Sequence, residues 1–322
     1  MTDASQPTQL TVDHVRSGEN TTRVTRVSKS DSEQSRAFVL VAGVGVAATY
    51  FEFLAPTLAL RGDVYALDLP GFGGMPRPHV QPTPEFFADQ VEAVLDHYGL
   101  DDAILIGHSM GTQVVTEVLV RRPELTHAVL VSPVVNEAEA TAAKQGVRFV
   151  QSSVRESLHL ALTALSAYML CGAVYFLTVL PHMLRYRIRD RVRLVQAKIL
   201  FIRGEYDRTS PRRFHSALTA AAAGSRRWEI EGAAHSIING HAIGVAELTI
   251  RHLDDELRQR GRMSSDAAEL PPARNADLAM LMNAMHSRAA EWVSALRGDE
   301  RGVARAKAQH ARILWRAYAP RR

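Results

Sequence analysis

Three residue types that together perform acyl chemistry stand in three separate short stretches of the sequence: Ser109 in GHSMG, Asp207 in RGEYD and His235 in GAAHS. A serine hydroxyl becomes a nucleophile when an imidazole takes its proton, and the imidazole needs a carboxylate to hold its tautomer. The order Ser, Asp, His along the chain is known for such triads on a parallel sheet. These residues predict nucleophilic attack on an acyl carbonyl.

The stretch around Ser109 predicts a sharp turn between a strand and a helix. Gly107 and Gly111 flank the serine at the spacing G-x-S-x-G, which removes side chains where strand and helix pass too close for a Cβ. The amide of Met110 then lies at a helix N-terminus, which favours a developing negative charge. We expect the second oxyanion donor to be the amide of Val44, in the glycine-containing loop after an apolar run.

Competing residues exist for two of the three roles. Glu205 lies two positions before Asp207 and is the alternative acid. His241 is the nearest alternative to His235 among the 13 histidines, and His235 is preferred because it directly follows the last predicted strand. For Ser109 the alternative is a glycine-packed corner between strand and helix with a hydroxyl that does no chemistry.

The elements that must position these residues follow from the hydrophobic pattern. Apolar runs alternate with helical patterns and short connections, which predicts a mostly parallel sheet with helices on both faces, an α/β class. Ligands bind such sheets at the carboxyl ends of the strands, so the loops that carry the candidate residues should share one face. Expected strands cover residues 22–27, 37–41, 63–68, 102–106, 127–131, 198–203 and 228–230, and expected helices cover 50–60, 83–98, 110–121, 211–222 and 242–260.

Composition shifts along the chain predict its organisation. We expect a flexible N-terminus over residues 1–21 and one α/β core built from residues 22–135 and 195–262. A helical cap over residues 136–194 is inserted into this core. Residues 263–322 are expected to form a linker and a basic helical C-terminal extension.

Four motifs together resemble the α/β-hydrolase superfamily: DLPGFG at 68–73, GHSMG, GEYD and GAAH. The resemblance covers roughly residues 22–260 and is closest in style to small bacterial esterases, monoacylglycerol-lipase-like enzymes and C–C bond hydrolases. It implies that Ser109 attacks an acyl carbonyl, His235 takes the proton, Asp207 orients the imidazole and water releases the acyl group. A serine nucleophile argues against the epoxide-hydrolase and haloalkane-dehalogenase branches. Relatives usually begin the first loop with His-Gly, whereas this chain has Ala42-Gly43.

The predicted cap contains a long apolar stretch without charge. Residues 157–184 hold no Asp, Glu, Lys or Arg, and a bilayer needs only about 20 such residues. Because the stretch is interrupted by Gly172 and Pro181 and lies between two halves of one sheet, we expect cap helices instead. Tyr168, Met169 and Phe176 are expected to line a cavity for a hydrophobic acyl or aromatic substrate. The alternatives are packing of the cap on the body and contact of the cap with a lipid surface.

The C-terminal extension carries two helical patterns. An apolar stripe in the first is expected to dock on the body or on a second subunit, giving a homodimer through the C-terminal helices. The second, residues 301–318, is basic. The stripe consists of Leu278, Leu281, Met285, Ala289, Trp292 and Leu296.

Bulk composition excludes several functional classes. Residues 251–322 hold 14 Lys and Arg against 9 Asp and Glu, a net of +5 in a chain whose total is +4, so nucleic-acid binding by the core is not expected. The single cysteine, Cys171, precludes an internal disulfide. No apolar leader, metal-ligand cluster or phosphate loop is present, so we expect a cytoplasmic protein without a cofactor or metal. The excess of Arg over Lys favours a bacterial source.

The leading functional hypothesis is a serine carboxylic-ester hydrolase that acts on a hydrophobic substrate. A C–C bond hydrolase of aromatic-degradation type is the second, since nothing in the sequence of the cap separates the two. A binding or signalling protein with little turnover on a hydrolase scaffold is the third. Transfer of the acyl group to an acceptor other than water also stays open.

Overall fold

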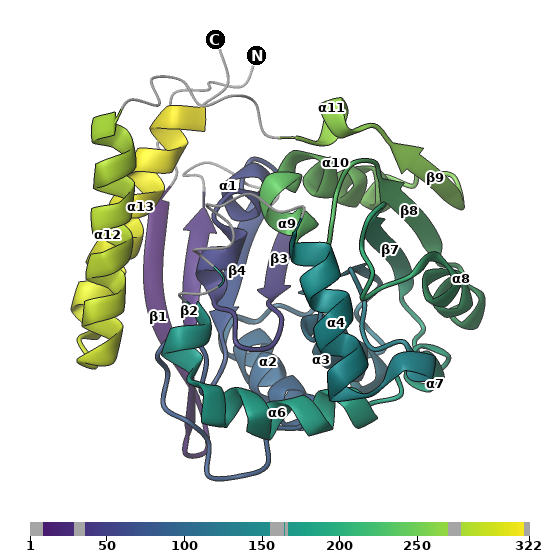
Figure 1. Ribbon diagram of the computed structural model, residues 1–322, viewed down its shortest axis with the longest axis horizontal. Coiled ribbons are helices and arrows are strands. Elements are labelled where there is room, and N and C mark those ends of the chain that lie inside the picture. The colour runs from purple at the N-terminus through teal and green to yellow at the C-terminus, as the bar shows by residue number, and fades with distance from the viewer. Residues whose placement is uncertain (1–8, 29–35, 155–163, 165–166, 270–277, 319–322) are drawn as a thin grey trace.

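The sheet is the framework of the molecule. The computed structural model describes residues 9–28, 36–154, 164, 167–269 and 278–318. Nine strands within these residues form one sheet in the order β1-β2-β4-β3-β5-β6-β7-β8-β9 (Figure 1). β1 and β2 are antiparallel to their neighbours, and from β4 to β9 all neighbouring strands are parallel. The strands are β1 Gln9–Ser17, β2 Asn20–Ser28, β3 Arg36–Val41, β4 Gly62–Asp68, β5 Ile104–His108, β6 His127–Val131, β7 Lys198–Gly204, β8 Arg226–Ile230 and β9 Arg260–Met263.

The two edges of the sheet differ from the sequence-based expectation. A flexible segment over residues 1–21 is wrong for its second half, because β1 is the edge strand and β2 pairs between β1 and β4; residues 1–8 lie outside the described residues. The helix expected over 242–260 ends at Leu253, and β9 then pairs with β8 at the other edge. A short helix, α11 (Ser265–Ala268), lies in the expected linker. Both edge strands are held by backbone pairing with a neighbouring strand. They therefore lack the continuous apolar run by which the sequence reveals the central strands.

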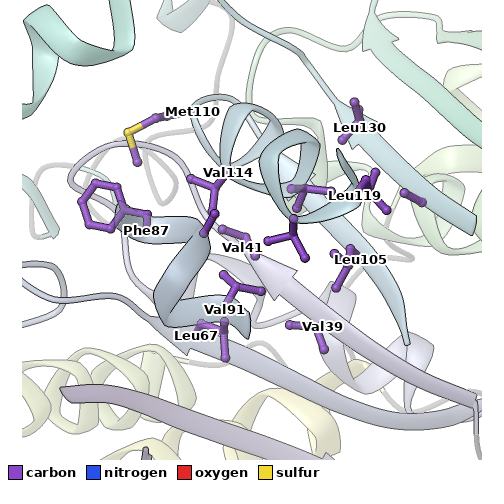
Figure 2. Packing of buried hydrophobic residues seen from close by; sticks show 14 of the residues in the cluster. Val39, Val41, Leu67, Phe87, Val91, Leu105, Met110, Val114, Leu119 and Leu130 are labelled. Carbon is purple, nitrogen blue, oxygen red and sulfur yellow. The ribbon is translucent and has the colours of Figure 1, made fainter. Parts of the chain in front are cut away.

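One face of the sheet is covered by α2 (Pro84–Tyr98), α3 (Gly111–Arg121) and α8 (Arg212–Ala221). Val91 and Val114 of the first two helices pack with Val39 and Leu105 of the sheet, and all four side chains are fully buried (Figure 2). Burial of each such side chain contributes about 2 kcal/mol. This packing fixes α3 on the sheet, and α3 is the helix that begins after Ser109.

The opposite face is covered by η1 (Ala48–Phe51), α1 (Leu54–Leu58), α9 (Ile237–Gly240) and α10 (Ala242–Leu253). Their apolar side chains form a second buried cluster with Leu40, Ile106 and Ile202 of the central strands. Because both faces are covered, the central strands are apolar throughout, as parallel strands of an α/β sheet require.

The chain between β6 and β7 contains η2 (Glu137–Glu139), α4 (Ala142–Ser153), α6 (Ala173–Arg185) and α7 (Ile188–Val192). This segment is anchored on α3, since the Tyr186 hydroxyl and the Arg191 guanidinium donate to Glu117 at 2.7 and 2.6 Å. Cys171 is enclosed here, and its carbonyl accepts a bond from Arg77. Part of the predicted cap, residues 155–163 and 165–166, lies outside the described residues. Among the helices that are described, none combines the length and hydropathy needed to cross a bilayer.

The C-terminal extension is a hairpin of two helices, α12 (Leu278–Leu296) and α13 (Glu300–Tyr318), that lies along β1 (Figure 1). The apolar stripe does not dock on the body through Met285, Ala289 and Leu296, which are exposed, and this part of the prediction is wrong. Small and charged residues face inward instead: the Ser287 hydroxyl lies 2.9 Å from His310 of α13. The side chains of Leu278 and Leu281 lie outside the described residues, and Trp292 is half-buried.

Candidate active site

Ser109 occupies a strained corner between β5 and α3. Its φ of 55° lies in the left-handed region, which is unfavourable for a residue with a Cβ by roughly 1–2 kcal/mol. A Cβ on Gly107 would lie 2.5 Å from the carbonyl oxygen of Gly111, and one on Gly111 would lie 2.1 Å from that of Val41. Both flanking glycines are therefore required by close backbone approach, as the motif predicts.

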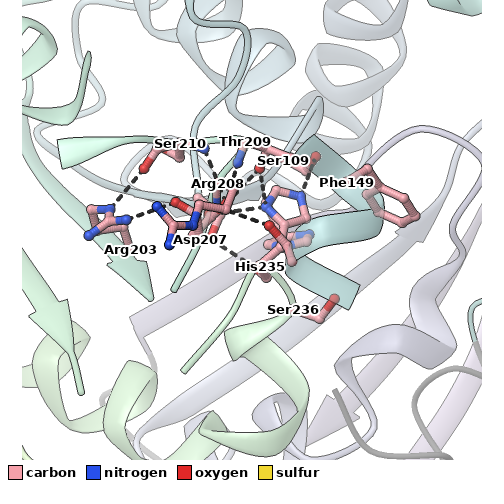
Figure 3. A network of polar contacts seen from close by, with 12 residues as sticks. Ser109, Phe149, Arg203, Asp207, Arg208, Thr209, Ser210, His235 and Ser236 are labelled. Atoms are coloured by element: carbon pink, nitrogen blue, oxygen red, sulfur yellow. Dashed lines mark hydrogen bonds and ion pairs between the residues drawn. The ribbon is translucent and has the colours of Figure 1, made fainter. Parts of the chain in front are cut away.

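Ser109, His235 and Asp207 meet at the carboxyl ends of β5, β8 and β7. His235 Nε2 lies 3.0 Å from the Ser109 hydroxyl oxygen, and His235 Nδ1 lies 3.1 Å from Asp207 Oδ2 (Figure 3). Nδ1–H can then donate to the carboxylate, which leaves Nε2 to accept the serine proton. The structure thus brings together the three residues singled out from the sequence, in the arrangement that general-base activation of a hydroxyl requires.

The carboxyl group of Asp207 is enclosed but remains ionised. Burial alone would raise its pKa, but the charge and hydrogen bond of His235 act against burial. Bonds from the Thr209 hydroxyl and the Ser210 amide act in the same direction, and together these partners hold the pKa of Asp207 below its ordinary value. A fixed negative charge therefore faces Nδ1 of His235.

Thr209 is a member of this group that sequence reasoning missed. Its hydroxyl oxygen lies 2.6 Å from Asp207 Oδ1 and 2.7 Å from His235 Nδ1. The hydroxyl donates to the carboxylate and accepts from Nδ1–H, so the imidazole proton is shared between Thr209 and Asp207. The available signal was an aspartate in a turn, whose side chain readily accepts from the backbone amide two residues on, as it does from the amide of Thr209 at 2.9 Å.

Arg203 holds the turn that carries Asp207, and it was also missed. This buried guanidinium donates to the carbonyl oxygens of Asp207 and Ser210, each at 2.8 Å, and to Glu229. Glu229 is also bound by Arg212 at 2.6 Å. The signal in the sequence was an arginine near the end of the otherwise apolar strand KILFIR.

Two side chains hold the loop of His235 through hydrogen bonds to its backbone. The carbonyl oxygen of His235 accepts hydrogen bonds from His108 Nε2 and from the Ser132 hydroxyl, both at 3.0 Å. Burial, together with the charge of nearby His235, lowers the pKa of His108 to about 3, so this ring is neutral at ordinary pH. Sequence reasoning gave His108 no role although it lies inside GHSMG.

The two candidate oxyanion donors border Ser109. Val44 lies in the loop after β3, and a Cβ on neighbouring Gly43 would lie only 3.0 Å from the Ser109 Cβ. Met110 is the N-cap of α3. Within the described part of the chain, neither amide donates to another backbone group. The proposed oxyanion role requires both N–H groups to lack a backbone acceptor in this way, and the role itself stays a prediction.

A largely apolar cavity of about 620 Å³ opens onto Ser109 and His235. The sequence-predicted residues Tyr168, Met169 and Phe176 all lie in its wall. Phe149 of α4 was not predicted, and its ring centre lies 6.2 Å from that of His235. Among the described residues that line the cavity, none is Lys, Arg, Asp or Glu. The wall includes Val46, Tyr50, Val134, Gln145, Leu180 and Met183.

The competing acid and base point elsewhere. Glu205 accepts from the Gly232 amide at 3.1 Å and from Arg262 at 2.9 Å. His241 pairs with Glu269 at 3.6 Å. Over the described ranges, no group of three or more His, Cys, Asp or Glu side chains could hold a metal ion.

Comparison with known proteins agrees with this architecture. Residues 36–166 match the family model described as alpha/beta hydrolase fold. A probable 1-acylglycerol-3-phosphate O-acyltransferase of Oryza sativa subsp. japonica is 32% identical over 136 residues, which are 40% of this chain and 33% of the relative. The matched part thus spans about a third of that relative's length.

Solved structures resemble a larger part of the chain. The 2-hydroxy-6-oxo-6-phenylhexa-2,4-dienoate hydrolase BphD of Rhodococcus sp. strain RHA1 superposes with a TM-score of 0.62 at 18% identity, over 77% of this chain and 100% of that chain. The carboxylesterase CesB (YbfK) of Bacillus subtilis gives 0.64 at 18% identity, over 78% and 94%. At such identities the likeness shows the fold, and the resemblance to the α/β hydrolases is confirmed at that level.

Proposed function

We propose that this chain, which has the α/β-hydrolase fold, is a serine hydrolase that cleaves a carboxylic ester of a hydrophobic substrate. The observation that carries the proposal is the contact of His235 Nε2 with the Ser109 hydroxyl, backed by Asp207 on Nδ1. This arrangement activates a nucleophile at neutral pH without a metal or cofactor. A resident cofactor is not part of the proposed reaction.

The proposed reaction has two halves. In the first, His235 takes the Ser109 proton while the hydroxyl oxygen attacks the ester carbonyl, and the amides of Val44 and Met110 bind the oxyanion. The imidazolium then gives its proton to the departing alcohol, which leaves an acyl group on Ser109. In the second half, His235 takes a proton from water, and the resulting attack on the acyl carbonyl releases the acid and restores the serine.

The cavity supports a hydrophobic acyl or aromatic group on the substrate. Its wall includes Phe149, Tyr168, Phe176, Leu180 and Met183, which offer apolar surface and no formal charge. A charged acyl chain would lose its hydration here without gaining an ion pair. We therefore propose a neutral substrate, with Tyr168, Met169 and Phe176 among the residues that bind its apolar part.

The function is tested by Ser109→Ala. We expect hydrolysis of p-nitrophenyl esters to fall by at least about a thousandfold and labelling by a fluorophosphonate to disappear, because nothing else in the site replaces the nucleophile. Val80→Ala, on an exposed loop residue, is the matched control and should behave as the wild type. Ester hydrolysis that survives Ser109→Ala would overturn the proposal, and labelling without turnover would favour a binding protein.

Two other reactions use the same nucleophilic serine chemistry: acyl transfer and carbon–carbon bond hydrolysis. Their substrates distinguish them from ester hydrolysis. The rice relative's name includes acyl transfer, which would need an alcohol acceptor in place of water. The hydrolase BphD is a dienoate hydrolase, and the carboxylate of a dienoate would meet no Lys or Arg in the described cavity wall. We therefore favour an ester over such a carbon–carbon substrate. Product analysis with and without added monoacylglycerol, alongside a ring-fission product, distinguishes all three.

The cap also supports contact with a lipid surface. Val147, Val150 and Val154 of the α4 segment are 56–80% exposed, and Val174 and Leu177 of α6 are also exposed. An apolar helix face of this kind binds at the boundary between lipid headgroups and acyl chains. Sedimentation with phosphatidylglycerol–phosphatidylcholine vesicles should be weakened by Val150→Glu and unaffected by Val80→Glu, which alters an exposed valine of a loop.

A homodimer through α12 is the second association we propose. The exposed stripe Met282, Met285, Ala289, Val293 and Leu296 is symmetric about Ala289, so an antiparallel second copy would place Met282 opposite Leu296 and Met285 opposite Val293. The two charged residues within α12, Arg288 and Glu291, face inward. Two copies would therefore meet without charged side chains between them.

A cytoplasmic location stays a prediction.

A further inference from the structure

Asp68, the last residue of β4, anchors the backbone that follows the oxyanion loop. Its side chain is completely buried. One carboxylate oxygen accepts a hydrogen bond from the Ala48 amide at 2.5 Å, and the other accepts from Arg23 at 2.9 Å. Ala48 begins η1 and follows Val44 by four residues. The position of the Val44 amide is therefore linked to the carboxylate of Asp68.

The C-terminal hairpin supplies part of the charge that Asp68 needs. Lys307 of α13, which is nearly buried, places its Nζ 3.3 Å from Asp68 Oδ2 and 3.4 Å from Glu291. Arg23 is shared with Glu300 of the same helix. Burial alone would raise the pKa of Asp68, but Lys307 and Arg23 reverse this effect and lower it. A buried carboxylate without such cations would be strongly unfavourable.

Glu52 provides a second connection between the hairpin and the site. It lies just after η1 and is bound by Arg288 of α12 at 2.5 Å and by His310 of α13 at 3.0 Å. The same carboxylate accepts from Asn239 of α9 at 3.2 Å. Asn239 follows His235 by four residues, so Glu52 joins the hairpin to the segment after the proposed base.

We propose that the hairpin α12–α13 is a positioning element of the active site. Lys307 acts through Asp68 on the oxyanion loop, and Arg288 acts through Glu52 on the segments that follow the oxyanion loop and His235. The inference rests on the proposed function, because it concerns the same serine site. It assigns a role to a segment that lies outside residues 36–166, the range matched by the family model.

This role has a kinetic signature. Within the described residues, the cavity wall contains none from α12 or α13, so loss of the connection should leave substrate binding almost unchanged. The amide of Val44 and the imidazole of His235 act on charge that develops in the transition state. A shift of these groups should therefore lower kcat while KM stays nearly constant.

The experiment uses the full chain with Lys307→Met, Arg288→Met and the control Arg305→Met, which alters an 81% exposed side chain of α13. Two readouts are the rate constant for labelling of Ser109 by a fluorophosphonate and the kcat and KM for p-nitrophenyl butyrate per labelled site. We expect the first two variants to lose about tenfold in labelling rate and kcat with KM within about twofold. Lys307→Arg should recover most of the loss, and Arg305→Met should match the wild type.

A second variant removes the negative charge that Lys307→Met leaves on Asp68 but keeps the hydrogen bond from the Ala48 amide. In the double variant Asp68→Asn/Lys307→Met, the introduced amide carbonyl still accepts from Ala48, and Arg23 loses Asp68 but keeps Glu300 and the Gly73 carbonyl as acceptors. Labelling should therefore recover to well above the Lys307→Met rate. If Lys307→Met fails to fold, the double variant and Arg288→Met still test the inference. Slow labelling of the neutral pair would contradict the route through Asp68.

Several outcomes overturn the inference. The inference is wrong if both variants, Lys307→Met and Arg288→Met, fold and are labelled at the wild-type rate. A lower melting temperature alone would show that the hairpin contributes to stability and not to the position of the active-site groups. A wild-type chain that is labelled at Ser109 but hydrolyses no ester would remove the proposed function, while the labelling rates would still decide the positioning role. A wild-type chain that is not labelled would overturn both.

Discussion

His235 Nε2 lies 3.0 Å from the hydroxyl oxygen of Ser109, although 126 positions separate the two residues in the sequence. Each residue leaves the carboxyl end of a strand, Ser109 after β5 and His235 after β8, and two further strands lie between them. The contact is therefore set by the sheet and not by the cap. We expect the triad geometry to persist in variants with substitutions in the cap.

Asp207→Asn should lower kcat by about a thousandfold to ten-thousandfold, because an amide cannot hold the required imidazole tautomer. Glu205→Gln is the matched control, since its carboxylate contacts Gly232 and Arg262 on the far side of the turn. We expect its kcat within about threefold of the wild type, because it makes no contact with His235. Steady-state kinetics decide the assignment, and the reverse ranking would make Glu205 the acid.

Thr209→Val tests the shared imidazole proton. Valine keeps the shape of the side chain but removes the hydroxyl that lies against Asp207 and His235. We expect kcat to fall about tenfold and the free energy of unfolding to fall by about 1–2 kcal/mol, the usual loss when a buried hydrogen bond is removed. Thr209→Ser should retain most activity. An unchanged kcat in Thr209→Val would show that the hydroxyl plays no part.

His215 should make the fold sensitive to mild acid. Burial and the nearby cations Arg203 and Arg227 lower its pKa to about 3, whereas an unfolded histidine has a pKa near 6.5. Between these values the unfolded chain binds the extra proton, so this stability is present above about pH 6.5 and is lost as pH falls. The slope from this residue is about 1.4 kcal/mol per pH unit.

The test compares urea midpoints at pH 7 and pH 5 for the wild type and His215→Phe. The phenylalanine ring keeps the contact with Phe201 and takes up no proton. We expect the variant to lose less stability on acidification than the wild type does. Part of the acid sensitivity should remain in both proteins, because burial lowers the pKa of His108 to about 3 as well. An identical pH dependence would contradict the assignment to His215.

Leu180→Trp should shorten the acyl pocket. Leu180 lies in the cavity wall on α6, away from the triad residues on the sheet. The added volume should raise KM for p-nitrophenyl dodecanoate by about tenfold or more and leave the acetate almost unchanged, since overpacking costs about 1–3 kcal/mol. A chain-length series measures the effect. Equal changes for short and long esters would place the acyl chain elsewhere.

Met285→Glu should separate the proposed dimer. Two copies would bring this residue against Val293 of α12, and a buried, unpaired carboxylate would oppose association. Asn283→Glu is the matched control, because Asn283 is exposed on the same helix but lies off the stripe. Analytical ultracentrifugation should show the mass halved only for Met285→Glu. A wild-type monomer would remove the proposal.

The central strands and the three site residues were predictable because their signals are local and strong. An uninterrupted apolar run such as residues 37–41 must be buried on both faces, and Gly107 and Gly111 report a backbone contact next to Ser109. The contact of Ser109 with His235 then follows from the rule that parallel strands end on one side of the sheet.

The missed features depend on partners distant in the sequence. β1 is an edge strand whose polar residues face outward, so it lacks the apolar run of the central strands. Thr209 and Arg203 have roles only because the turn after β7 folds back onto them. On α12 the inward face was decided by ion pairs such as Arg288 with Glu52, which no periodicity of apolar residues reveals.

The enclosed position of Cys171 makes the protein well suited to spectroscopic study. The thiol has no exposed surface, and burial, only partly offset by Arg77, raises its pKa to about 11. Reaction with maleimide dyes requires the thiolate, so the native chain should react very slowly at neutral pH. A cysteine introduced at exposed Val150 of α4 would then carry a single fluorophore, and its emission would report the surroundings of α4 as substrate or lipid vesicles are added.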